Sequence, residues 1–422
     1  AAEVVPVRRN LSAFGRASAG TCMGLVSRAL IYAASPLFNG TTHTDDPRLK
    51  SLVGYPEANQ ERWKAAADAA AKLIATGQFQ IYDRHMDRDG NEIPGWGRQA
   101  IFAPSDCNTY NTYKDKKYTS GAYCCHIFTL HKDAGFNREN CFNPPSCHGS
   151  GDGGYPNLDL AESFPMADGK PIGQSKYSYD RMDMGANRDP RFNFWFTYHG
   201  SKCFAAGFAE NDISTYHGVC STGDAIYKAT RTGLYFKKGT YISKFLFGVP
   251  QTHCLIRYEE ILLNWAEAVN EYYGPNHKEQ LGALSLTPLK VLKMIREGAG
   301  IETGVPEGEN VDDWLDDDSK AMYGLQTGMS QDEMREAIRL ERRLELMIEG
   351  HRFYDVRRWK IAETTENCMI HGWELTRKLD GTITGRVVNV RQHVFRKAAY
   401  FWPIPYDEVN RSDDLIQNPY YE

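Results

Sequence analysis

The sequence predicts a mainly α-helical fold, in which paired helices of the tetratricopeptide type flank a long irregular region. Apolar residues recur at helical spacing near the start of the chain and again after residue 253, which is typical of amphipathic helices. Between these parts, residues 83–250 are dense in Gly, Asp, Asn and aromatic residues. Because loops inserted into a rigid helical frame commonly carry recognition, this middle region is the expected ligand-binding region.

The first predicted elements are two helices that form an antiparallel pair. Residues 15–38 and 56–79 both carry apolar residues at helical spacing. Pro36 ends the first pattern, and Gly77 is the expected terminator of the second. Residues 1–82 therefore form the N-terminal helical hairpin of the scaffold.

The middle and C-terminal parts differ in pattern. Within 83–250 we expect short strands, with β-like runs at residues 191–198 and 233–238. Residues 251–422 return to helical periodicity and form the remaining hairpins and a closing segment, all within one domain. The predicted helices in this part cover residues 253–273, 287–299 and 331–362.

The last of these helices carries opposite charges three residues apart, a spacing that brings side chains together on one helix face. Such pairs normally indicate a solvated or interhelical surface and contribute little stability each. We assign them structural roles. The pairs are Glu336–Arg339, Arg342–Glu345 and Glu349–Arg352.

Composition excludes several classes of protein. With 41% hydrophobic and 24% charged residues in 422, the chain has the composition of a globular protein. The net charge of −5 offers no basic face for phosphates, so no nucleic-acid partner is predicted. No apolar stretch is long enough for a membrane-spanning helix.

Ten cysteines raise the question of metal binding or disulfides. Their spacing does not fit a zinc knuckle or ribbon, so no metal site and no cofactor is predicted. Disulfides in an exported, loop-rich segment are favoured, with connectivity left open. The residues concerned are Cys124, Cys125, Cys141 and Cys147, accompanied by His126, His131 and His148.

Ordered motifs extend over nearly the whole chain. The strongest is residues 338–359, IRLERRLELMIEGHRFYDVRRW. The others are residues 28–39, 155–156, 161–169, 187–192, 257–268, 295–296, 299–301, 402–405 and 417–419. In this order, the motifs resemble the SusD/RagB family of nutrient-binding lipoproteins.

The resemblance implies a SusD-like α-α superhelix that supports an irregular ligand-binding half. It implies a lipid-anchored protein on the extracellular face of the outer membrane, where it works with a SusC-like TonB-dependent transporter. The cargo would be an oligosaccharide or a peptide, and the family has no catalytic residues to transfer. Of its motifs, residues 187–190 look suited to fixing a loop. Charged residues 341–345 look suited to locking neighbouring helices.

Family members usually begin with an acylated cysteine and a long segment ahead of the helix at residues 15–38. That portion is not in this sequence, so we expect the chain to be incomplete at its N-terminus and the lipid anchor to lie outside it. The helix at 15–38 would then lack its usual partner and expose an apolar face.

Ligand contacts are expected from aromatic and amide side chains that follow the first hairpin. Aromatic rings stack on sugar faces and on peptide groups, and short amides hydrogen-bond to both, so this chemistry leaves glycan and peptide cargo open. The predicted ligand-binding residues are Trp96, Asn108, Tyr110, Tyr113, Tyr118 and Tyr155.

Two other classes of function compete with this interpretation. A glycosidase needs two opposed carboxylates, but the acidic run at residues 312–318 reads as a solvated loop. No nucleophile elbow, P-loop or HExxH pattern occurs. An intracellular helical-repeat scaffold is the second alternative, and it would keep its cysteines as thiols.

Overall fold

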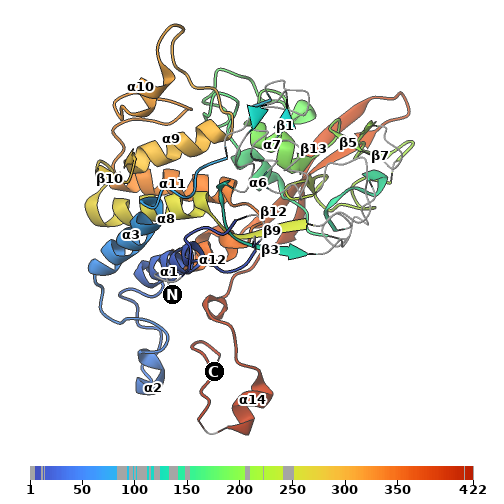
Figure 1. Ribbon diagram of the computed structural model, residues 1–422. Coiled ribbons are helices and arrows are strands. Elements are labelled where there is room, and N and C mark those ends of the chain that lie inside the picture. Colours follow the sequence, from blue (N-terminus) through green and yellow to red (C-terminus); the bar gives the residue numbers. More distant parts are fainter. Residues whose placement is uncertain are drawn as a thin grey trace.

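In the computed structural model the long helices gather in one lobe, and the hairpin of β12 (Met369–Arg377) and β13 (Ile383–Gln392) projects from the opposite side (Figure 1). The structure describes residues 5–10, 13, 15–82, 93–94, 98, 101, 112–113, 116–117, 124–132, 141–147, 153–204, 210–221, 223–240, 251–412 and 414–421. The C-terminal segment, with α14 (Tyr406–Arg411), extends away from the helical lobe (Figure 1). No helix in these ranges combines the length and the apolar character that a bilayer crossing requires.

The two predicted N-terminal helices pack against each other and against the central helix α8. Helix α1 (Ala19–Ala34) begins at a capping box formed by Ser18. Helix α3 (Glu61–Ile74) buries a row of alanines such as Ala70, and small side chains let neighbouring helices approach closely. Gly77, with φ of 62°, follows its end as predicted.

Helix α8 (Tyr258–Tyr273) is the centre of the helical lobe and is buried on all sides over most of its length. Its indole ring, Trp265, is fully buried in the main core. The predicted start at residue 253 is wrong, because strand β9 (Gln251–Arg257) pairs there with β3 (His126–Lys132). Backbone groups that are used in a sheet ladder cannot begin a helix, so α8 starts where the pairing ends.

Three further helices complete the scaffold. Helix α9 (Pro288–Gly298) has proline at its first position, and α11 (Gln331–Glu345) begins at a capping box. The continuous helix predicted for residues 331–362 is wrong, because the chain breaks before α12 (His351–Arg358). Ile348 and Gly350 both have positive φ there, 55° and 88°, which no α-helix accommodates.

The run predicted as a strand at residues 191–198 is mostly a helix, α7 (Pro190–Trp195). Asp189 caps its N-terminus and a proline occupies the first position, and these local signals outweigh the β-like composition. Only the two residues of β4 (Phe196–Thr197) are strand. They pair with β8 (Tyr235–Phe236), which confirms the centre of the second predicted run.

A sheet of three strands was not predicted. Strand β12 (Met369–Arg377) lies between β13 (Ile383–Gln392), which runs antiparallel to it, and β7 (His217–Gly218), which runs parallel. Asp380 and Gly381 lie in the turn of the hairpin, where Gly381 has φ of 86°. An Asp-Gly pair between alternating residues is a hairpin signal that the sequence does contain.

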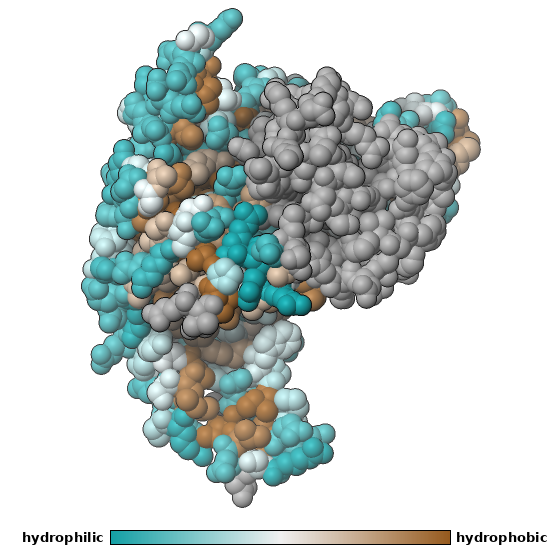
Figure 2. Space-filling model, viewed as in Figure 1, coloured by the Kyte–Doolittle hydropathy of each residue, from teal (hydrophilic) through white to brown (hydrophobic). Residues whose placement is uncertain are grey.

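Hydrophobic surface is visible on the extension formed by α2 (Pro47–Lys50) and the C-terminal segment (Figure 2).

The remaining helices and strands are short. The short helices are α2 (Pro47–Lys50), α6 (Leu158–Ser163), α10 (Val311–Leu315) and α13 (Ala362–Thr365), with 3-10 turns at Pro145–Cys147, Arg181–Asp183 and Lys397–Tyr400. The short strands are β1 (Thr112–Tyr113), β2 (Lys116–Lys117), β5 (Lys202–Phe204), β6 (Glu210–Asp212), β10 (Glu279–Leu281) and β11 (Leu284–Leu286).

A buried charge cluster joins α11 to the irregular half. Arg191 donates to Glu341 at 2.6 Å and to Glu345 at 2.8 Å. Arg257, at the end of β9, also binds Glu345 at 2.8 Å. Burial alone would raise the pKa of Glu345, but Arg98, Arg257 and Arg191 outweigh it and lower the pKa. The expected locking of neighbouring elements by α11 is thus confirmed for both glutamates.

The helix-face ion pairs predicted along residues 331–362 are confirmed only in part. Glu336 and Arg339 pair at 2.7 Å. Arg342 instead reaches Asp355 of α12 at 2.8 Å, because both side chains are buried between the two helices. Glu349 binds Arg257 at 2.8 Å, and Arg352 pairs with Glu366 at 3.6 Å. The predicted pairs Arg342–Glu345 and Glu349–Arg352 are therefore wrong.

The cysteines of the middle region behave differently from one another. Cys147 is disulfide-bonded, whereas Cys124 and Cys141 are not. Burial raises the pKa of the Cys125 thiol. Across the described ranges, no group of three or more His, Cys, Asp or Glu side chains is arranged to hold a metal ion.

Candidate functional site

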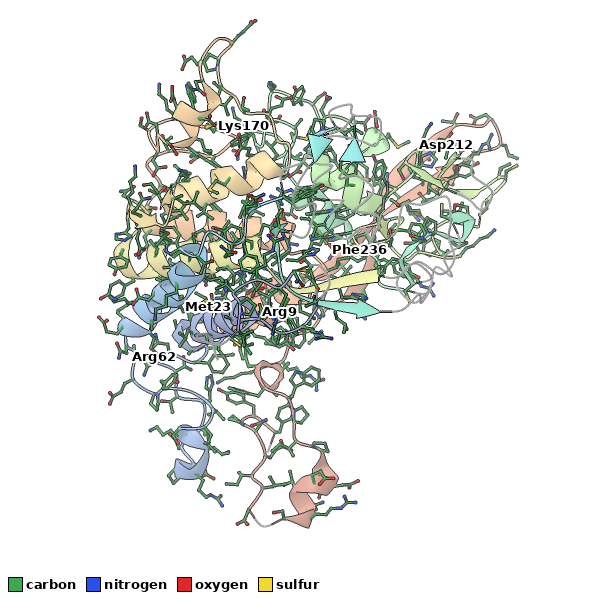
Figure 3. All side chains as sticks on the ribbon, viewed as in Figure 1. Arg9, Met23, Arg62, Lys170, Asp212 and Phe236 are labelled. Carbon is green, nitrogen blue, oxygen red and sulfur yellow. The ribbon has the colours of Figure 1, made fainter. Side chains whose placement is uncertain are left out.

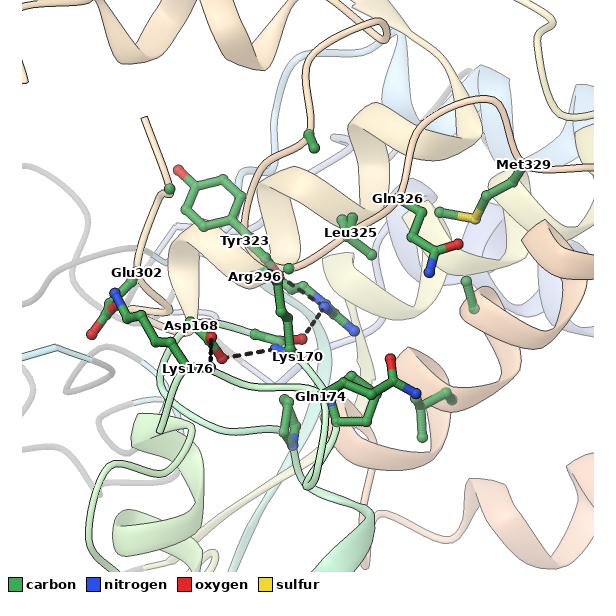
Figure 4. Close-up of a pocket in the computed structure, with 18 of the residues that line it drawn as sticks. Asp168, Lys170, Gln174, Lys176, Arg296, Glu302, Tyr323, Leu325, Gln326 and Met329 are labelled. Atoms are coloured by element: carbon green, nitrogen blue, oxygen red, sulfur yellow. Dashed lines mark hydrogen bonds and ion pairs between the residues drawn. The ribbon is translucent and has the colours of Figure 1, made fainter. Parts of the chain in front are cut away.

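A cleft of about 1040 Å³ opens between three loops and one face of α11. The loops comprise residues 162–176, 302–304 and 321–329, and each belongs to a different part of the sequence. Helix α9 lies behind them and supplies Arg296 to the cleft wall (Figure 4). Lys170 lies on the side of the molecule that carries α9 and α10 (Figures 1 and 3).

Arg296 ties the loops together from below. One of its terminal nitrogens donates to the carbonyl oxygens of Gly169, at 3.0 Å, and Tyr323, at 2.9 Å (Figure 4). Its Nε donates to Glu341 at 2.7 Å, which links the cleft to the buried charge cluster. Charge-assisted bonds of this kind are stronger than neutral ones, so this arginine fixes the cleft floor.

The two loops that Arg296 joins cross in backbone contact. A Cβ added at Gly169 would lie 1.9 Å from the carbonyl oxygen of Tyr323, so only glycine fits there. Gly324 packs back against Gly169 in the same way. Tyr323 itself has a positive φ of 51°, a conformation that tyrosine rarely adopts. This crossing defines where the cleft floor lies.

The first loop is held in shape by the carboxylate of Asp168. It accepts hydrogen bonds from the Ser175 hydroxyl at 2.8 Å, the Lys176 N–H at 3.1 Å and the Lys170 N–H at 3.2 Å. Burial by itself would raise the pKa of Asp168, but these bonds lower it. The carboxylate therefore stays ionised and serves to organise the loop.

The second loop is joined to the first and third by main-chain and side-chain bonds. The Glu302 N–H donates to Ala167 at 2.9 Å, and the Tyr323 N–H donates to Thr303 at 3.0 Å. The Glu302 carboxylate accepts from Lys176 at 2.7 Å and from the Tyr177 hydroxyl at 2.5 Å. All three loops are thus fixed relative to one another.

Polar groups remain open toward the cleft from opposite walls. Gln174 comes from the first loop and Gln326 from the third, with Lys170 nearby (Figure 4). All three side chains are exposed, and none makes a side-chain hydrogen bond or ion pair within the part of the chain that the structure describes. Two amides and an ammonium group together can donate to and accept from hydroxyl or peptide groups.

One side of the cleft is apolar. Leu325 is buried beneath the third loop, Met329 lies beside Gln326 (Figure 4), and Ala337 and Leu340 of α11 continue the surface. A ligand that has both an apolar face and polar edges matches such a wall.

The carboxylates of the cleft are already engaged. Glu336 pairs with Arg339, and Glu162 binds Arg181. Glu333 caps α11, and its bonds from the backbone and side chain of Ser330 lower its pKa. A carboxylate that is occupied by a donor and held ionised is not set up as a general acid. The cleft thus offers polar groups and an apolar side to a ligand.

Of the residues predicted to contact ligand, most lie outside the described residues: Trp96, Asn108, Tyr110 and Tyr118. Tyr113 lies in β1, opposite Lys116 of β2. Tyr155 is half-buried, and its ring packs edge-on against the buried ring of Tyr235 at 6.2 Å, away from the cleft lining. All six assignments stay predictions.

Sequence reasoning missed Lys170, Gln174 and Gln326. The first two follow a motif that was recognised at residues 161–169, but its chemistry read as architectural. Gln326 lies 152 positions after Gln174 in the chain, and nothing in the sequence links the two segments. Only the folded loops bring them to one cleft.

Comparison with known proteins places the chain clearly. The profile described as the SusD family matches residues 124–421. A solved SusD-like protein from Bacteroides fragilis aligns over 100% of this chain and 68% of its own, with 24% identity and a TM-score of 0.68. A SusD-like carbohydrate-binding protein from the same species aligns over 98% of this chain and 68% of its own, with 20% identity and a TM-score of 0.65.

Among curated proteins, none matches the chain significantly. The family profile nevertheless covers well over half of the sequence, and the solved structures share the fold. The expected mainly helical SusD-like fold is confirmed. The chain belongs to the SusD family.

Proposed function

We propose that this protein is a lipid-anchored, cell-surface binding protein that captures oligosaccharides and passes them to a SusC-like TonB-dependent transporter in the outer membrane. The observation that carries the proposal is the cleft with fixed walls, where Gln174, Gln326 and Lys170 are exposed beside an apolar side wall. Sugar rings combine C–H faces with hydroxyl edges, so they match this combination of surfaces.

The cargo assignment draws support from a family relative. One solved structure with the same fold is described as a SusD-like carbohydrate-binding protein, and it covers 98% of this chain. Peptides use similar amide and apolar contacts, so they are the alternative cargo that the test below distinguishes.

Capture without turnover is part of the proposal. The cleft carboxylates are held by donors, and Asp168 and Glu333 have lowered pKa values, so neither is ready to donate a proton near neutral pH. Incubating the purified protein with any oligosaccharide that it binds should yield no hydrolysis product. Release of reducing ends would favour the glycosidase alternative.

Export is supported by cysteine chemistry. Cys147 is disulfide-bonded, and disulfides persist in oxidising compartments outside the cytoplasm. This weighs against an intracellular scaffold. The membership in the SusD family supports a position at the cell surface beside a transporter.

The proposal is tested by binding. The protein is screened on glycan and peptide arrays, and the best ligand is then titrated calorimetrically against the triple variant Lys170→Ala/Gln174→Ala/Gln326→Ala. Each lost hydrogen bond removes about 1 kcal/mol, so the loss of all three should lower the affinity roughly a hundredfold.

A matched control uses the same side-chain types on another surface. Lys72→Ala/Gln78→Ala/Gln80→Ala removes one exposed lysine and two exposed glutamines at the end of α3. This variant should bind like the wild type. Equal affinities of the two triple variants would place the site elsewhere, and binding to peptides alone would overturn the oligosaccharide proposal.

A further inference from the structure

The sheet formed by β13, β12 and β7 carries a row of polar side chains on one face. Glu374 of β12 lies directly opposite Arg386 of β13, and Thr376 lies opposite His217 of β7. Since alternate residues of a strand point to the same side, these four side chains share a face. The row runs across all three strands.

The buried Glu374 carboxylate organises this row. His217 Nε2 lies 3.0 Å from one carboxylate oxygen, and the Arg386 Nε binds the other. The Tyr227 hydroxyl also hydrogen-bonds to Glu374, and burial together with that bond raises the pKa of Tyr227. The side chain of Glu374 is only 2% exposed, whereas that of Arg386 is 72% exposed. One buried anion thus fixes the positions of three surface groups.

Tyr227 is held at the surface in a conformation that tyrosine avoids. Its φ is 70°, and its N–H donates to Thr230 at 2.9 Å in a tight turn. The neighbours Ala225, Ile226 and Ala229 are buried, so the turn is anchored in the protein. The turn requires a positive φ, which glycine or asparagine would accept at less cost. Yet a tyrosine stands there with 54% of its surface exposed.

Packing does not account for this tyrosine. Its ring meets the His217 ring edge-on at 5.8 Å and its hydroxyl bonds to Glu374, while 54% of the residue stays exposed. Residues kept in disfavoured backbone conformations cluster at ligand sites, where the surrounding structure enforces them. An oriented, exposed ring beside fixed polar groups is therefore a candidate platform for a ligand.

The polar groups around the Tyr227 ring can form further hydrogen bonds. His217 Nε2 contacts Glu374 and the Thr376 hydroxyl, and among the described residues neither its Nδ1 nor the two terminal nitrogens of Arg386 have a hydrogen-bond partner. Thr384, which lies opposite Thr376, is exposed next to them. Donors and acceptors in fixed positions beside an aromatic face suit the hydroxyl groups of a sugar.

We propose that this sheet face is a second carbohydrate subsite, at which Tyr227 stacks on the C–H face of one pyranose ring while Arg386 and His217 hydrogen-bond to its hydroxyl groups. The inference rests on the proposed function, because it assumes an oligosaccharide cargo. The sheet face is a contact apart from the cleft. In Figure 3, Lys170 of the cleft lies over the helical lobe, whereas Asp212, five residues before His217, lies near the projecting hairpin of β12 and β13. A long chain or a branched glycan would engage both places.

Saturation-transfer NMR tests the subsite with single sugars. The probes are the methyl pyranosides of glucose, galactose, mannose and xylose, each added in millimolar excess to the wild-type protein. We expect at least one to show saturation of the ring protons on one face. Because aromatic contacts contribute about 1 kcal/mol, Tyr227→Asn should weaken that signal roughly fivefold to tenfold.

Asparagine tolerates a positive φ, so Tyr227→Asn preserves the turn and should lower the melting temperature only through the lost hydroxyl bond to Glu374, a loss that it shares with Tyr227→Phe. Tyr227→Phe retains the ring and should retain most of the signal. The control Tyr406→Asn removes a tyrosine that is 75% exposed on α14 and should change nothing. A purely structural tyrosine would lower the melting temperature in both Tyr227 variants and leave sugar binding intact.

The outcomes separate this inference from the proposed function. A signal that disappears in the Lys170/Gln174/Gln326 triple variant but survives in Tyr227→Asn refutes the second subsite and leaves the cleft in place. A glycan array without binding, together with silent pyranosides, refutes both. A signal that survives the cleft variant and depends on Tyr227 supports the subsite.

Discussion

Arg296 connects the candidate site to the interior through one guanidinium group. It binds two loop carbonyls on one side and Glu341 on the other, while only 5% of its side chain is exposed. Removing a buried charge leaves its partners without compensation, which costs more than the pair itself contributes. The arginine therefore affects stability and binding together.

Replacing Arg296 by methionine should lower the free energy of unfolding by about 3–5 kcal/mol, because Glu341 and two carbonyls lose a donor. Urea denaturation measures this change. The control Arg411→Met removes an exposed partner of Glu408 and should cost less than about 1 kcal/mol. Similar losses in both variants would contradict the role given to Arg296.

Glu349 makes the stability of the fold depend on pH. It accepts from Arg257 at 2.8 Å and from Lys238 at 2.8 Å. Burial would raise its pKa, but these cations lower it from 4.5 to about 2. The folded carboxylate thus resists protonation, so its contribution is present above pH 4.5 and is lost as the pH falls toward 2. The contribution amounts to about 3 kcal/mol.

The variant Glu349→Gln should be less stable than the wild type at pH 7, and the difference should narrow below pH 4.5. Urea unfolding at a series of pH values follows the change. Glu408→Gln, on the exposed α14, serves as the control. Its free energy of unfolding should follow the same pH dependence as that of the wild type. A constant gap for Glu349→Gln at all pH values would show that its charge is not what stabilises the fold.

At the level of elements, helices were predictable and strands mostly were not. The long helices can be predicted from apolar periodicity, from capping residues and from a terminal glycine such as Gly77. Strand β9 was missed because pairing with β3, far away in sequence, decides its conformation. The break at Gly350 lies inside a continuous helical pattern, where one positive φ outweighs periodicity.

The central helix should carry much of the stability. Leu263 of α8 is fully buried, and cutting it to alanine should cost about 2–5 kcal/mol through lost burial and a residual cavity. Leu379, at the hairpin turn, is 93% exposed, so Leu379→Ala should change stability by less than about 0.5 kcal/mol. Thermal and urea unfolding measure both variants, and equal losses of stability would contradict the central role of α8.

For the whole molecule, the sequence motifs predicted the family and its architecture but not the cleft. The motifs are continuous segments, so they can be read from the chain, whereas Gln174 and Gln326 meet only after folding. The predicted aromatic residues were chosen for their residue types and for their position after the first hairpin. The two sets of residues therefore remain separate hypotheses about where cargo binds.

A comparison of two variants addresses this. Changing Trp96, Tyr110 and Tyr113 together to alanine should abolish capture without altering the melting curve, because stacking surface is lost. Calorimetric titration of this variant beside the cleft variant shows whether either set carries affinity. Unchanged affinity in the aromatic variant would remove those residues from the site.

The crossed loops at Gly169 and Tyr323 have a consequence for how cargo leaves. Because the described walls of the cleft are already tied together, a ligand that binds there spends little free energy on ordering them. In the proposed function, the release of the sugar would then depend on how quickly it dissociates from the cleft and on how quickly the transporter recaptures it. In the proposed function, transfer to the transporter would be favoured when the cleft binds the sugar weakly and the transporter binds it more tightly.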